Sequence, residues 1–396
     1  MMQNRKALLL LSALCLLVLA LSQCVNTTPS SNDPRGPAFA GSSTCRQCHQ
    51  PIYDTYIKSA HFNTTQPVSE QNLLAHLDST SRFPYNDSTW VQVHKGDSGL
   101  YQTAYVNGRA LESHRMDILF GVQHAQTFLY WNGNRTFELP LSYYTGVQQW
   151  GTSPGFSATN INFKRFIGAN CFECHSSNIN KQLNASTAGI EEVLDKNSLI
   201  YGIDCERCHG PALAHVDFHN KNPNSKQPKY ITQIASLTRQ QQLDVCAVCH
   251  SGNNKLQEKS TFKFTPGDTL AHFFTIWHTD DTTSNFDVHG NQYQLLSRSK
   301  CFTQSNSITC STCHNPHANT TNNIQAYSSI CASCHKQVEH SFDQTNGNAL
   351  KNNCIDCHMP SQPSQAITFR LAGSHENSAY MLRTHRIAVY PTKKDQ

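Results

Sequence analysis

Pairs of cysteines separated by two residues and followed at once by a histidine recur seven times along the chain. The two thiols of such a pentapeptide can form thioethers with the two vinyl groups of a haem, and the adjacent imidazole then lies under the iron as its proximal ligand. The seven copies use fourteen of the 17 cysteines. They are Cys45-Arg-Gln-Cys48-His49, Cys171-Phe-Glu-Cys174-His175, Cys205-Glu-Arg-Cys208-His209, Cys246-Ala-Val-Cys249-His250, Cys310-Ser-Thr-Cys313-His314, Cys331-Ala-Ser-Cys334-His335 and Cys354-Ile-Asp-Cys357-His358.

These pentapeptides, numbered motifs 1 to 7 in chain order, predict one covalent c-type haem each. Structural zinc sites pair two Cys-x-x-Cys units, or one unit with a distant pair of histidines, and give no reason for a histidine after every second cysteine. A disulfide scaffold gives no reason for the fixed two-residue spacing. The sequence therefore predicts seven c-type haems, with the seven motif histidines as proximal iron ligands.

The chain has few apolar residues for its length. Hydrophobic residues make up 38 % of its 396 residues, whereas a chain of this size normally folds around one or two apolar cores. Seven macrocycles would supply much apolar surface, so we expect the chain without haem to be poorly folded. The formal charge is +4 with histidine neutral. Ionised propionates bring each ferric haem to about −1, so the mature holoprotein is predicted to be acidic, and no basic cluster indicates nucleic-acid binding.

The N-terminus has the layout of an export signal. Arg5 and Lys6 precede an apolar run over residues 7–21, which is too short to span a membrane. Cys24 follows this run, as at the cleavage site of a bacterial lipoprotein, although Gln23 replaces the small residue that usually precedes such a cysteine. A leader cleaved elsewhere, with Cys24 incidental, is the alternative.

We therefore expect residues 1–23 to be a signal peptide of lipoprotein type and Cys24 to carry the lipid. Residues 24–43 are rich in Ser, Thr, Asn and Pro, which is typical of a flexible tether. The predicted location is the bacterial cell envelope. The exported chain would face the periplasm or sit on the outer membrane as a lipoprotein, held by its lipid anchor.

The short intervals between most motifs favour helical or irregular chain wrapped on haem. We predict a mainly α and irregular, haem-cored domain over residues 44–390, followed by a tail at residues 391–396. A small antiparallel β subdomain is predicted at residues 84–145, with a hairpin turn at Asn132-Gly-Asn134. Four segments of this stretch are rich in β-branched and aromatic residues: residues 90–94, 100–106, 127–131 and 136–139.

The residues that follow several motifs resemble those of a known family. The matching segments are Tyr56-Ile-Lys-Ser-Ala-His61, Gly210-Pro-Ala-Leu-Ala-His215, Asn315-Pro-His317 and Met359-Pro360. From about Gly41 to Tyr390, the chain resembles the multihaem c-type cytochromes related to cytochrome c-554 and hydroxylamine oxidoreductase. Residues 120–150 resemble the strand-rich insert of some members.

A low-spin electron-transfer haem takes a second axial ligand, and fourteen histidines lie outside the motifs. The family resemblance implies that His61, His215 and His317 serve on the distal side. Placement along the chain adds four candidates, which are His340, His385, His289 and His114. The reserves are His124, His219, His272 and His278. For every one of these residues the alternative is a surface or hydrogen-bonding histidine.

Cys301 is the cysteine that lies outside both the leader and the motifs, nine residues before Cys310. One interpretation makes it an alternative axial ligand, whose thiolate would lower the potential of one haem. The others are a buried inert thiol and an exposed reactive thiol.

Two functions fit these features. The first is an electron carrier that moves electrons along seven haems between redox protein partners, or from a quinol-linked membrane donor. The second is an oxidoreductase that acts on a small nitrogen or sulfur compound at one haem with an open distal site. Ammonia-forming nitrite reductases of the resembled family have one Cys-x-x-Cys-Lys motif, whereas all seven motifs here end in His. The sequence therefore favours the carrier and assigns no catalytic residue.

Overall fold

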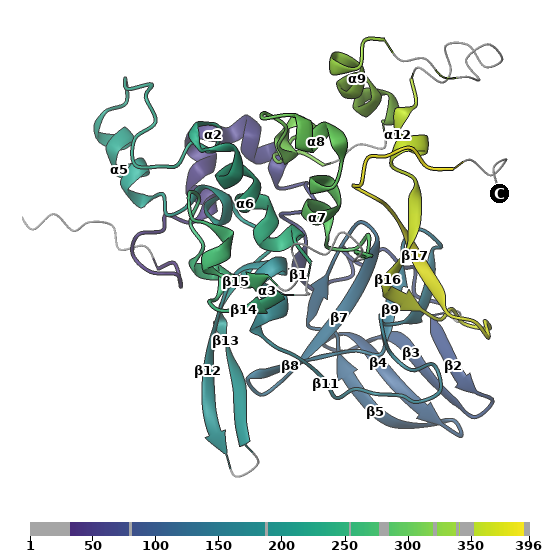
Figure 1. Cartoon of the computed structure of the whole chain (residues 1–396). Coiled ribbons are helices and arrows are strands. Elements are labelled where there is room, and N and C mark those ends of the chain that lie inside the picture. The colour runs from purple at the N-terminus through teal and green to yellow at the C-terminus, as the bar shows by residue number, and fades with distance from the viewer. Residues whose placement is uncertain are drawn as a thin grey trace, which may run out of the picture.

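The chain is richer in strand than in helix. The computed structural model describes residues 32–78, 81–186, 189–252, 255–276, 285–319, 323–337, 340 and 352–391. It is 27 % helical and 31 % strand, with several antiparallel sheets, so the prediction of a mainly α and irregular fold is wrong. Helices gather in one half of the molecule and sheets in the other (Figure 1). The predicted leader with Cys24, and most of the predicted tail, lie outside the described residues.

Four consecutive strands form an antiparallel sheet after motif 1. They are β2 (Arg82–Asn86), β3 (Thr89–Gly96), β4 (Gly99–Val106) and β5 (Arg109–Arg115). Side chains alternate between the two faces of a strand, and in β3 the side chains of Val91 and Val93 are buried while those of Trp90 and Gln92 are half-buried.

A second, seven-stranded sheet shares its core with the first. It contains β1 (Thr65–Pro67), β6 (Ile118–Phe120), β7 (Ala125–Asn132), β8 (Arg135–Glu138), β9 (Leu141–Tyr144), β10 (Gln149–Thr152) and β11 (Arg165–Ile167). Gly133, with a φ of 58°, lies in the turn that joins β7 to β8. Phe83 and Val91 of the first sheet pack in one cluster with Phe128 and Leu141 of the second. Strands therefore extend from residue 65 to residue 167, well beyond residues 84–145.

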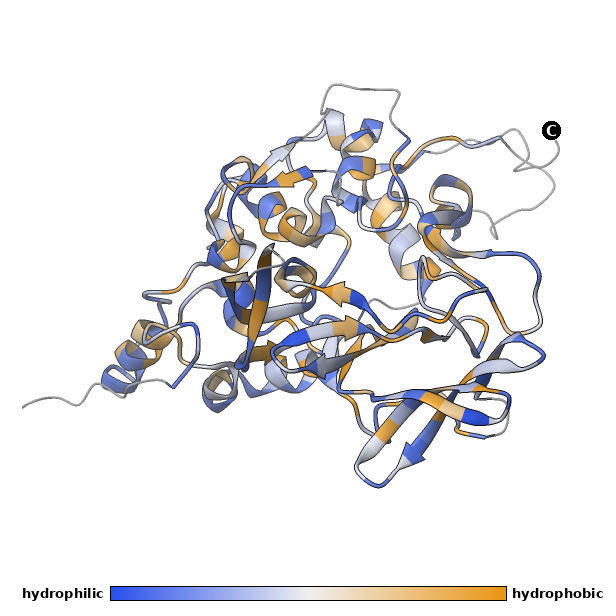
Figure 2. Cartoon of the chain, turned by 90° about the horizontal axis from the view of Figure 1, so that it is seen from below, coloured by the Kyte–Doolittle hydropathy of each residue, from blue (hydrophilic) through white to orange (hydrophobic). Residues whose placement is uncertain are grey.

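The helices are short and lie together on the other side (Figure 1). They are α2 (Ser42–Tyr56), α3 (Ala169–His175), α4 (Cys205–His209), α5 (Leu213–Lys221), α6 (Arg239–His250), α7 (Gln292–Ser297), α8 (Lys300–Gln304), α9 (Ile324–Cys334) and α12 (Cys354–His358). Four 3-10 helices accompany them: η1 (Ile234–Ser236), η2 (Thr261–Lys263), η3 (Leu270–His272) and η4 (Cys310–Thr312). The helices carry hydrophobic and hydrophilic residues together (Figure 2). The largest apolar cluster contains only residues of the range 75–163, and the helices contribute to two smaller clusters.

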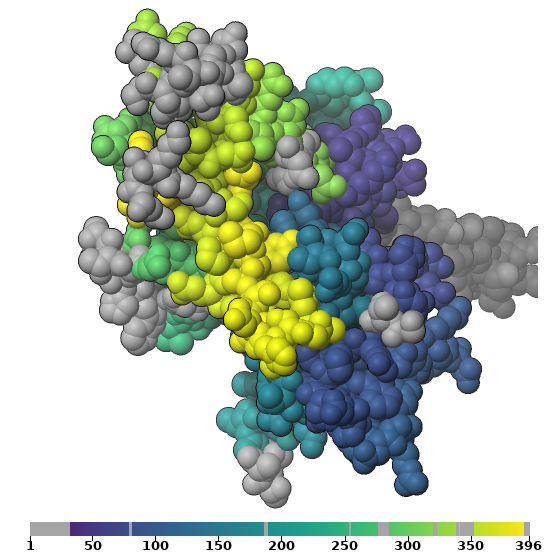
Figure 3. Space-filling model, turned by 90° about the vertical axis from the view of Figure 1, so that its right-hand side faces the viewer, coloured from purple at the N-terminus to yellow at the C-terminus, as the bar shows by residue number. Residues whose placement is uncertain are grey.

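Three two-stranded ribbons complete the described chain. β12 (Ser176–Ser186) and β13 (Gly189–Tyr201) form a long hairpin that projects from the body (Figure 1). The other two pair β14 (Lys255–Gln257) with β15 (Phe274–Ile276), and β16 (Ser361–Phe369) with β17 (Ser378–Arg383). The C-terminal ribbon lies along the surface from the helical half to the sheets (Figure 3). There the ring of Phe369 stacks on that of Tyr144, with centroids 3.7 Å apart.

Candidate haem sites

Each motif begins on a helix. Motifs 1, 2, 3, 4, 6 and 7 lie in or at the end of α2, α3, α4, α6, α9 and α12, and motif 5 begins in η4. Residues three and four positions apart are neighbours on a helix surface, so each turn brings its two thiols and its imidazole to one face. Every cysteine of the described residues is free of disulfide bonds. All fourteen motif thiols are therefore available for thioether formation.

The residues between the two cysteines of motif 3 fasten it to its neighbours. The buried Glu206 carboxylate accepts a 2.8 Å hydrogen bond from the Ala40 N–H, just before motif 1, and burial raises the pKa of this carboxyl group. The buried Arg207 guanidinium donates to the Thr261 carbonyl at 2.8 Å and to the carbonyl of Glu173, in motif 2, at 3.1 Å. Buried polar side chains thus hold the helical turns of motifs 2 and 3 together and fix the approach to motif 1.

Five motif histidines each face a histidine from elsewhere in the chain. Their ring centroids are separated by 6.0–6.4 Å. The pairs are His49 with His215, His209 with His317, His250 with His61, His314 with His385, and His358 with His340.

This separation fits one metal ion between the two rings of each pair. An imidazole nitrogen binds a metal at about 2.0–2.1 Å, so two imidazoles on opposite sides of one iron have ring centroids roughly 6 Å apart. The described residues contain no group of three or more His, Cys, Asp and Glu side chains arranged to hold a metal directly. Two imidazoles supply only the axial positions, and a haem supplies the four equatorial nitrogens.

Hydrogen bonds orient several of these imidazoles by their Nδ1 atoms. The Nδ1–H of His215 donates to the Lys229 carbonyl and that of His358 donates to the Ala388 carbonyl, both at 2.8 Å. These bonds leave Nε2 without its hydrogen, as in metal-bound histidines whose other nitrogen is held by a backbone carbonyl.

Burial also keeps several imidazoles of these sites neutral. It lowers the pKa of His61, His175 and His385 to about 4, with smaller contributions from neighbouring histidines. The neutral imidazole is the form that binds a metal.

Neighbouring motifs lie close together in space. The helices of motifs 1 and 3, 2 and 4, 4 and 5, and 6 and 7 are neighbours. In three pairs the thiols of different motifs are near enough to shift each other's pKa, and these pairs are Cys45 with Cys205, Cys174 with Cys249, and Cys246 with Cys310. Motifs 3 and 4 are linked by the proximity of Cys208 to Cys249. Cys331 of motif 6 lies within electrostatic range of Cys313 in motif 5 and Cys354 in motif 7. The order in space is therefore 1, 3, 4, 5, 6, 7, with motif 2 beside motif 4.

Comparisons with known proteins show which proteins this chain is similar to. The family model "Cytochrome c554 and c-prime" matches residues 149–210, which hold motifs 2 and 3. "Multiheme cytochrome MtrA" of Shewanella baltica (strain OS185) is 25 % identical over 180 residues, which are 42 % of this chain and 52 % of that protein. The match thus spans about half the length of that relative. The chain is a multihaem c-type cytochrome.

The overall architecture of this cytochrome is similar to that of a solved structure. The outer cell wall cytochrome OcwA matches with a TM-score of 0.51 over 88 % of this chain and 79 % of that one, at 14 % identity. That likeness concerns the fold. A relationship to hydroxylamine oxidoreductase stays a prediction.

Two of the predicted distal histidines, His289 and His114, do not have their rings opposite a motif imidazole. His289 lies within electrostatic range of His175 in motif 2 and contributes, after burial, to lowering the pKa of His175. His114 lies on β5, where its Nε2 is 2.8 Å from the Glu112 carboxylate and its ring stacks on Tyr130. The structure thus gives no support to His114 as a haem ligand.

The reserve histidines have other surroundings. The His124 Nδ1 is 3.2 Å from the Tyr380 hydroxyl, and the His219 ring contacts that of His215. His272 lies on η3, and His278 lies outside the described residues.

Motifs 2 and 6 lack such a facing imidazole. The His175 ring of motif 2 stacks on that of Phe120, with centroids 4.7 Å apart, and no imidazole of the described residues makes a ring contact with His335 of motif 6. Cys301, on α8, lies within electrostatic range of Cys313 in motif 5 and of Cys331 in motif 6. Cys301 therefore lies close to both of these motifs.

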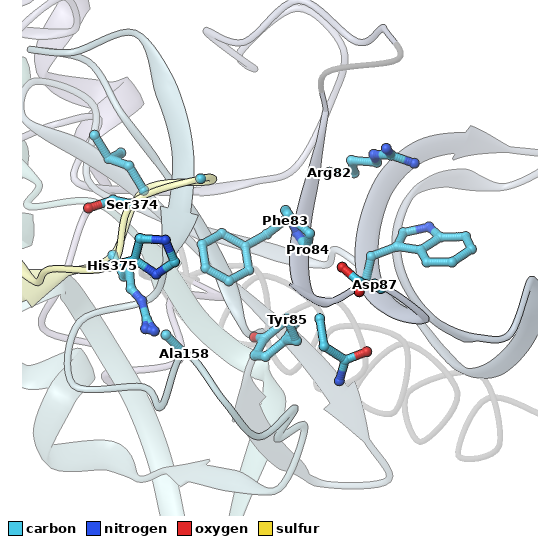
Figure 4. Close-up of a pocket in the computed structure, with 13 residues that line it drawn as sticks. Arg82, Phe83, Pro84, Tyr85, Asp87, Ala158, Ser374 and His375 are labelled. Atoms are coloured by element: carbon cyan, nitrogen blue, oxygen red, sulfur yellow. The ribbon is translucent and has the colours of Figure 1, made fainter.

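The cytochrome also has a pocket away from the motifs. It has a volume of about 530 Å³ and lies between the hairpin of β2 and β3 and the loop after β16. Phe83 and His375 approach each other in it (Figure 4). No motif residue lines this pocket, so it is not a haem site.

Among the described residues, no helix is both long enough and apolar enough to cross a bilayer.

Proposed function

We propose that this cytochrome binds seven haems, one at each motif, and conducts electrons along them between redox partners. The observation that carries the proposal is that neighbouring motifs lie close together across the helical half. They run from α2 at one edge of the helical half to α9 and α12 at the other edge (Figure 1). Bound haems exchange single electrons, and closely spaced ones pass them along the chain, with potentials set by ligands, burial and hydrogen bonds.

The proposed axial ligands follow from the facing imidazoles. Haems 1, 3, 4, 5 and 7 take the five histidine pairs with ring centroids 6.0–6.4 Å apart. Haem 2 takes His175 and, on its distal side, His289, the non-motif histidine whose charge acts most strongly on His175. These six irons are proposed to be six-coordinate and low-spin, which suits electron transfer without chemistry on a substrate.

The proposed location is the bacterial cell envelope, outside the inner membrane. The leader layout and Cys24 support export and lipid attachment, and the matched structure is described as that of an outer cell wall cytochrome. The partners proposed are a redox protein on the envelope side and a quinol-linked donor at the membrane.

A second candidate function rests on motif 6. Because His335 has no facing imidazole among the described residues, the haem of motif 6 is the candidate for an open distal site. Such a site would let the cytochrome act on a small nitrogen or sulfur compound. The electron-transfer role does not depend on it.

One set of spectra on the holoprotein tests both functions. Intact mass should show seven haems, electron paramagnetic resonance should show at least six low-spin ferric irons, and a reductive titration should reduce all of them. Fewer haems, or haems that do not exchange electrons with one another, would contradict the first function. A high-spin signal that shifts with cyanide or nitrite would support the second function, and a protein inert to both ligands would exclude it.

A further inference from the structure

An exposed basic loop lies at the edge of the helical half. The segment of residues 220–230, here called the lysine loop, begins near the end of α5, which stands beyond α2 (Figure 1). Lys221, Lys226 and Lys229 are all exposed, and the loop contains no Asp or Glu. In the part of the chain that the structure describes, none of the three ammonium groups forms an ion pair.

The lysine loop is attached to the first haem site. The backbone carbonyl of Lys229 accepts the 2.8 Å hydrogen bond from His215 Nδ1, and His215 is the imidazole that faces His49 of motif 1. The Tyr230 ring packs edge-on against Phe218 of α5, with centroids 5.8 Å apart, which fixes the end of the loop to the helix. The loop is thus held against the distal side of the first haem site.

The helix that carries motif 1 lies next to this loop and has charged side chains of its own. On α2 the Arg46 guanidinium is 3.8 Å from the Asp54 carboxylate, so these two charges offset each other.

The charges of α5 and the lysine loop sum to a cationic surface. Asp54 on α2 is offset by Arg46, and Asp217 on α5 is the remaining carboxylate of these two helices. Against it stand the three lysines of the loop, which are Lys221, Lys226 and Lys229. This surface is therefore positive, although the holoprotein as a whole is predicted to be acidic.

Motif 1 also lies at one end of the series of motifs, where electrons must enter or leave. We propose that the lysine loop docks the acidic face of a protein redox partner and thereby makes haem 1 the entry port of the chain. This inference rests on the proposed electron-transfer function. In each encounter one electron leaves the reduced cofactor of the partner and reduces the ferric iron held by His49 and His215, and no covalent bond forms or breaks. Opposite charges raise the association rate and orient the encounter.

The test measures electron transfer from a reduced flavodoxin, a small acidic one-electron donor protein, to the ferric holoprotein by stopped flow. The second-order rate constant should fall by about tenfold or more as salt rises from about 0.01 M to 1 M, where the screening length shrinks from about 30 Å to 3 Å. The triple variant Lys221→Glu, Lys226→Glu and Lys229→Glu should lose about tenfold at low salt and most of the salt dependence.

The matched control is Lys95→Glu, Lys164→Glu and Lys181→Glu, which changes the net charge equally on the strand-rich half and should keep most of the rate. Equal rates in the two triple variants, a rate independent of salt, or no reduction of the wild type by flavodoxin would overturn the inference. The inference would also be overturned if the triple variant of the loop kept the salt dependence of the rate but shifted the reduction potential of haem 1. The lysines would then pair with the haem propionates and not with the partner. Failure of the proposed function looks different: flavodoxin would reduce haem 1 while the other haems stayed oxidised.

Discussion

The imidazole rings of His49 and His215 face each other with centroids 6.4 Å apart and planes inclined by only 13°. His49 belongs to motif 1 on α2, whereas His215 lies on α5 and is held there by the Lys229 carbonyl. The distal position of this site is therefore set by the packing of a separate helix. Its geometry depends on α5 and its loop, not on the motif alone.

Replacing His215 by Ala should convert one haem from low-spin to high-spin, because haem 1 loses its sixth ligand while thioethers and His49 keep it in place. Electron paramagnetic resonance of the ferric protein measures the change. The control is His219→Ala, one turn further along α5, whose ring contacts His215 with centroids 4.6 Å apart. The control should keep every low-spin signal. If His219→Ala gives the high-spin haem instead, the ligand assignment at motif 1 is wrong.

Replacing Gly202 by Ala should destabilise the protein and disturb haem 4. Gly202 has a φ of 65°, and a Cβ there would overlap the carbonyl oxygen of Phe62, the residue next to His61. Gly133→Ala is a matched control, because its φ is 58° and nothing lies within 4 Å of the added Cβ. Both variants carry backbone strain, and the overlap should cost Gly202→Ala about 1–3 kcal/mol more in the free energy of unfolding. Chemical denaturation followed by circular dichroism checks this, and equal losses would contradict the argument.

The family resemblance pointed to three histidines whose rings face motif imidazoles in the structure. His61, His215 and His317 came from segments flanking the motifs, and each lies opposite a motif imidazole. Ligation itself stays a prediction at all of them. His114 was chosen only for its position in the long gap between motifs, and strand pairing instead places it on β5 beside Glu112. His340 and His385 were also chosen by placement, and both face motif imidazoles, so placement alone does not decide which histidine tertiary packing brings to a motif.

Most strands outside residues 84–145 were not predicted from the sequence. The β12–β13 hairpin is built largely from Ser, Asn, Lys and Glu, without a regular alternation of apolar residues. Only its base is anchored in an apolar cluster, through Ile179 and Leu194. Its pairing is therefore set by backbone hydrogen bonds and by contacts with the body, which a search for apolar alternation does not detect. The chemistry of a covalent motif is local, whereas sheet formation is not.

Replacing Arg35 by Met should destabilise the segment that leads into motif 1. The Arg35 guanidinium forms ion pairs with Asp33 and Asp204 at 2.8 Å and with Glu206 at 3.1 Å, and all four side chains are nearly inaccessible. Removing the cation leaves buried carboxylates without their counter-charge, which should cost about 3–5 kcal/mol in unfolding free energy.

The control for Arg35 is Arg46→Met on α2. The Arg46 side chain is 58 % exposed and its guanidinium is 3.8 Å from the Asp54 carboxylate, so its loss should cost less than about 1 kcal/mol. Urea denaturation of both variants compares them directly. If Arg35→Met lowered the unfolding free energy as little as Arg46→Met does, water would be solvating the carboxylates that Arg35 no longer covers.

Glu138 should make the stability of the protein decline as the pH rises toward neutrality. Burial raises the pKa of this carboxyl group to about 7, although the Arg165 guanidinium at 3.3 Å opposes the shift. Between about pH 4.5 and pH 7 the folded chain keeps a proton that the unfolded chain has released. The contribution of Glu138 is therefore fully present below about pH 4.5 and is lost as the pH passes 7, by at most about 3 kcal/mol. The measurement compares the unfolding free energies of the wild type and of Glu138→Gln from pH 4 to 8, and the two curves should separate over this window. The control is Glu70→Gln, at an exposed position paired with Lys95. Its curve should follow that of the wild type. Parallel curves for Glu138→Gln and the wild type would show that the carboxyl group titrates normally.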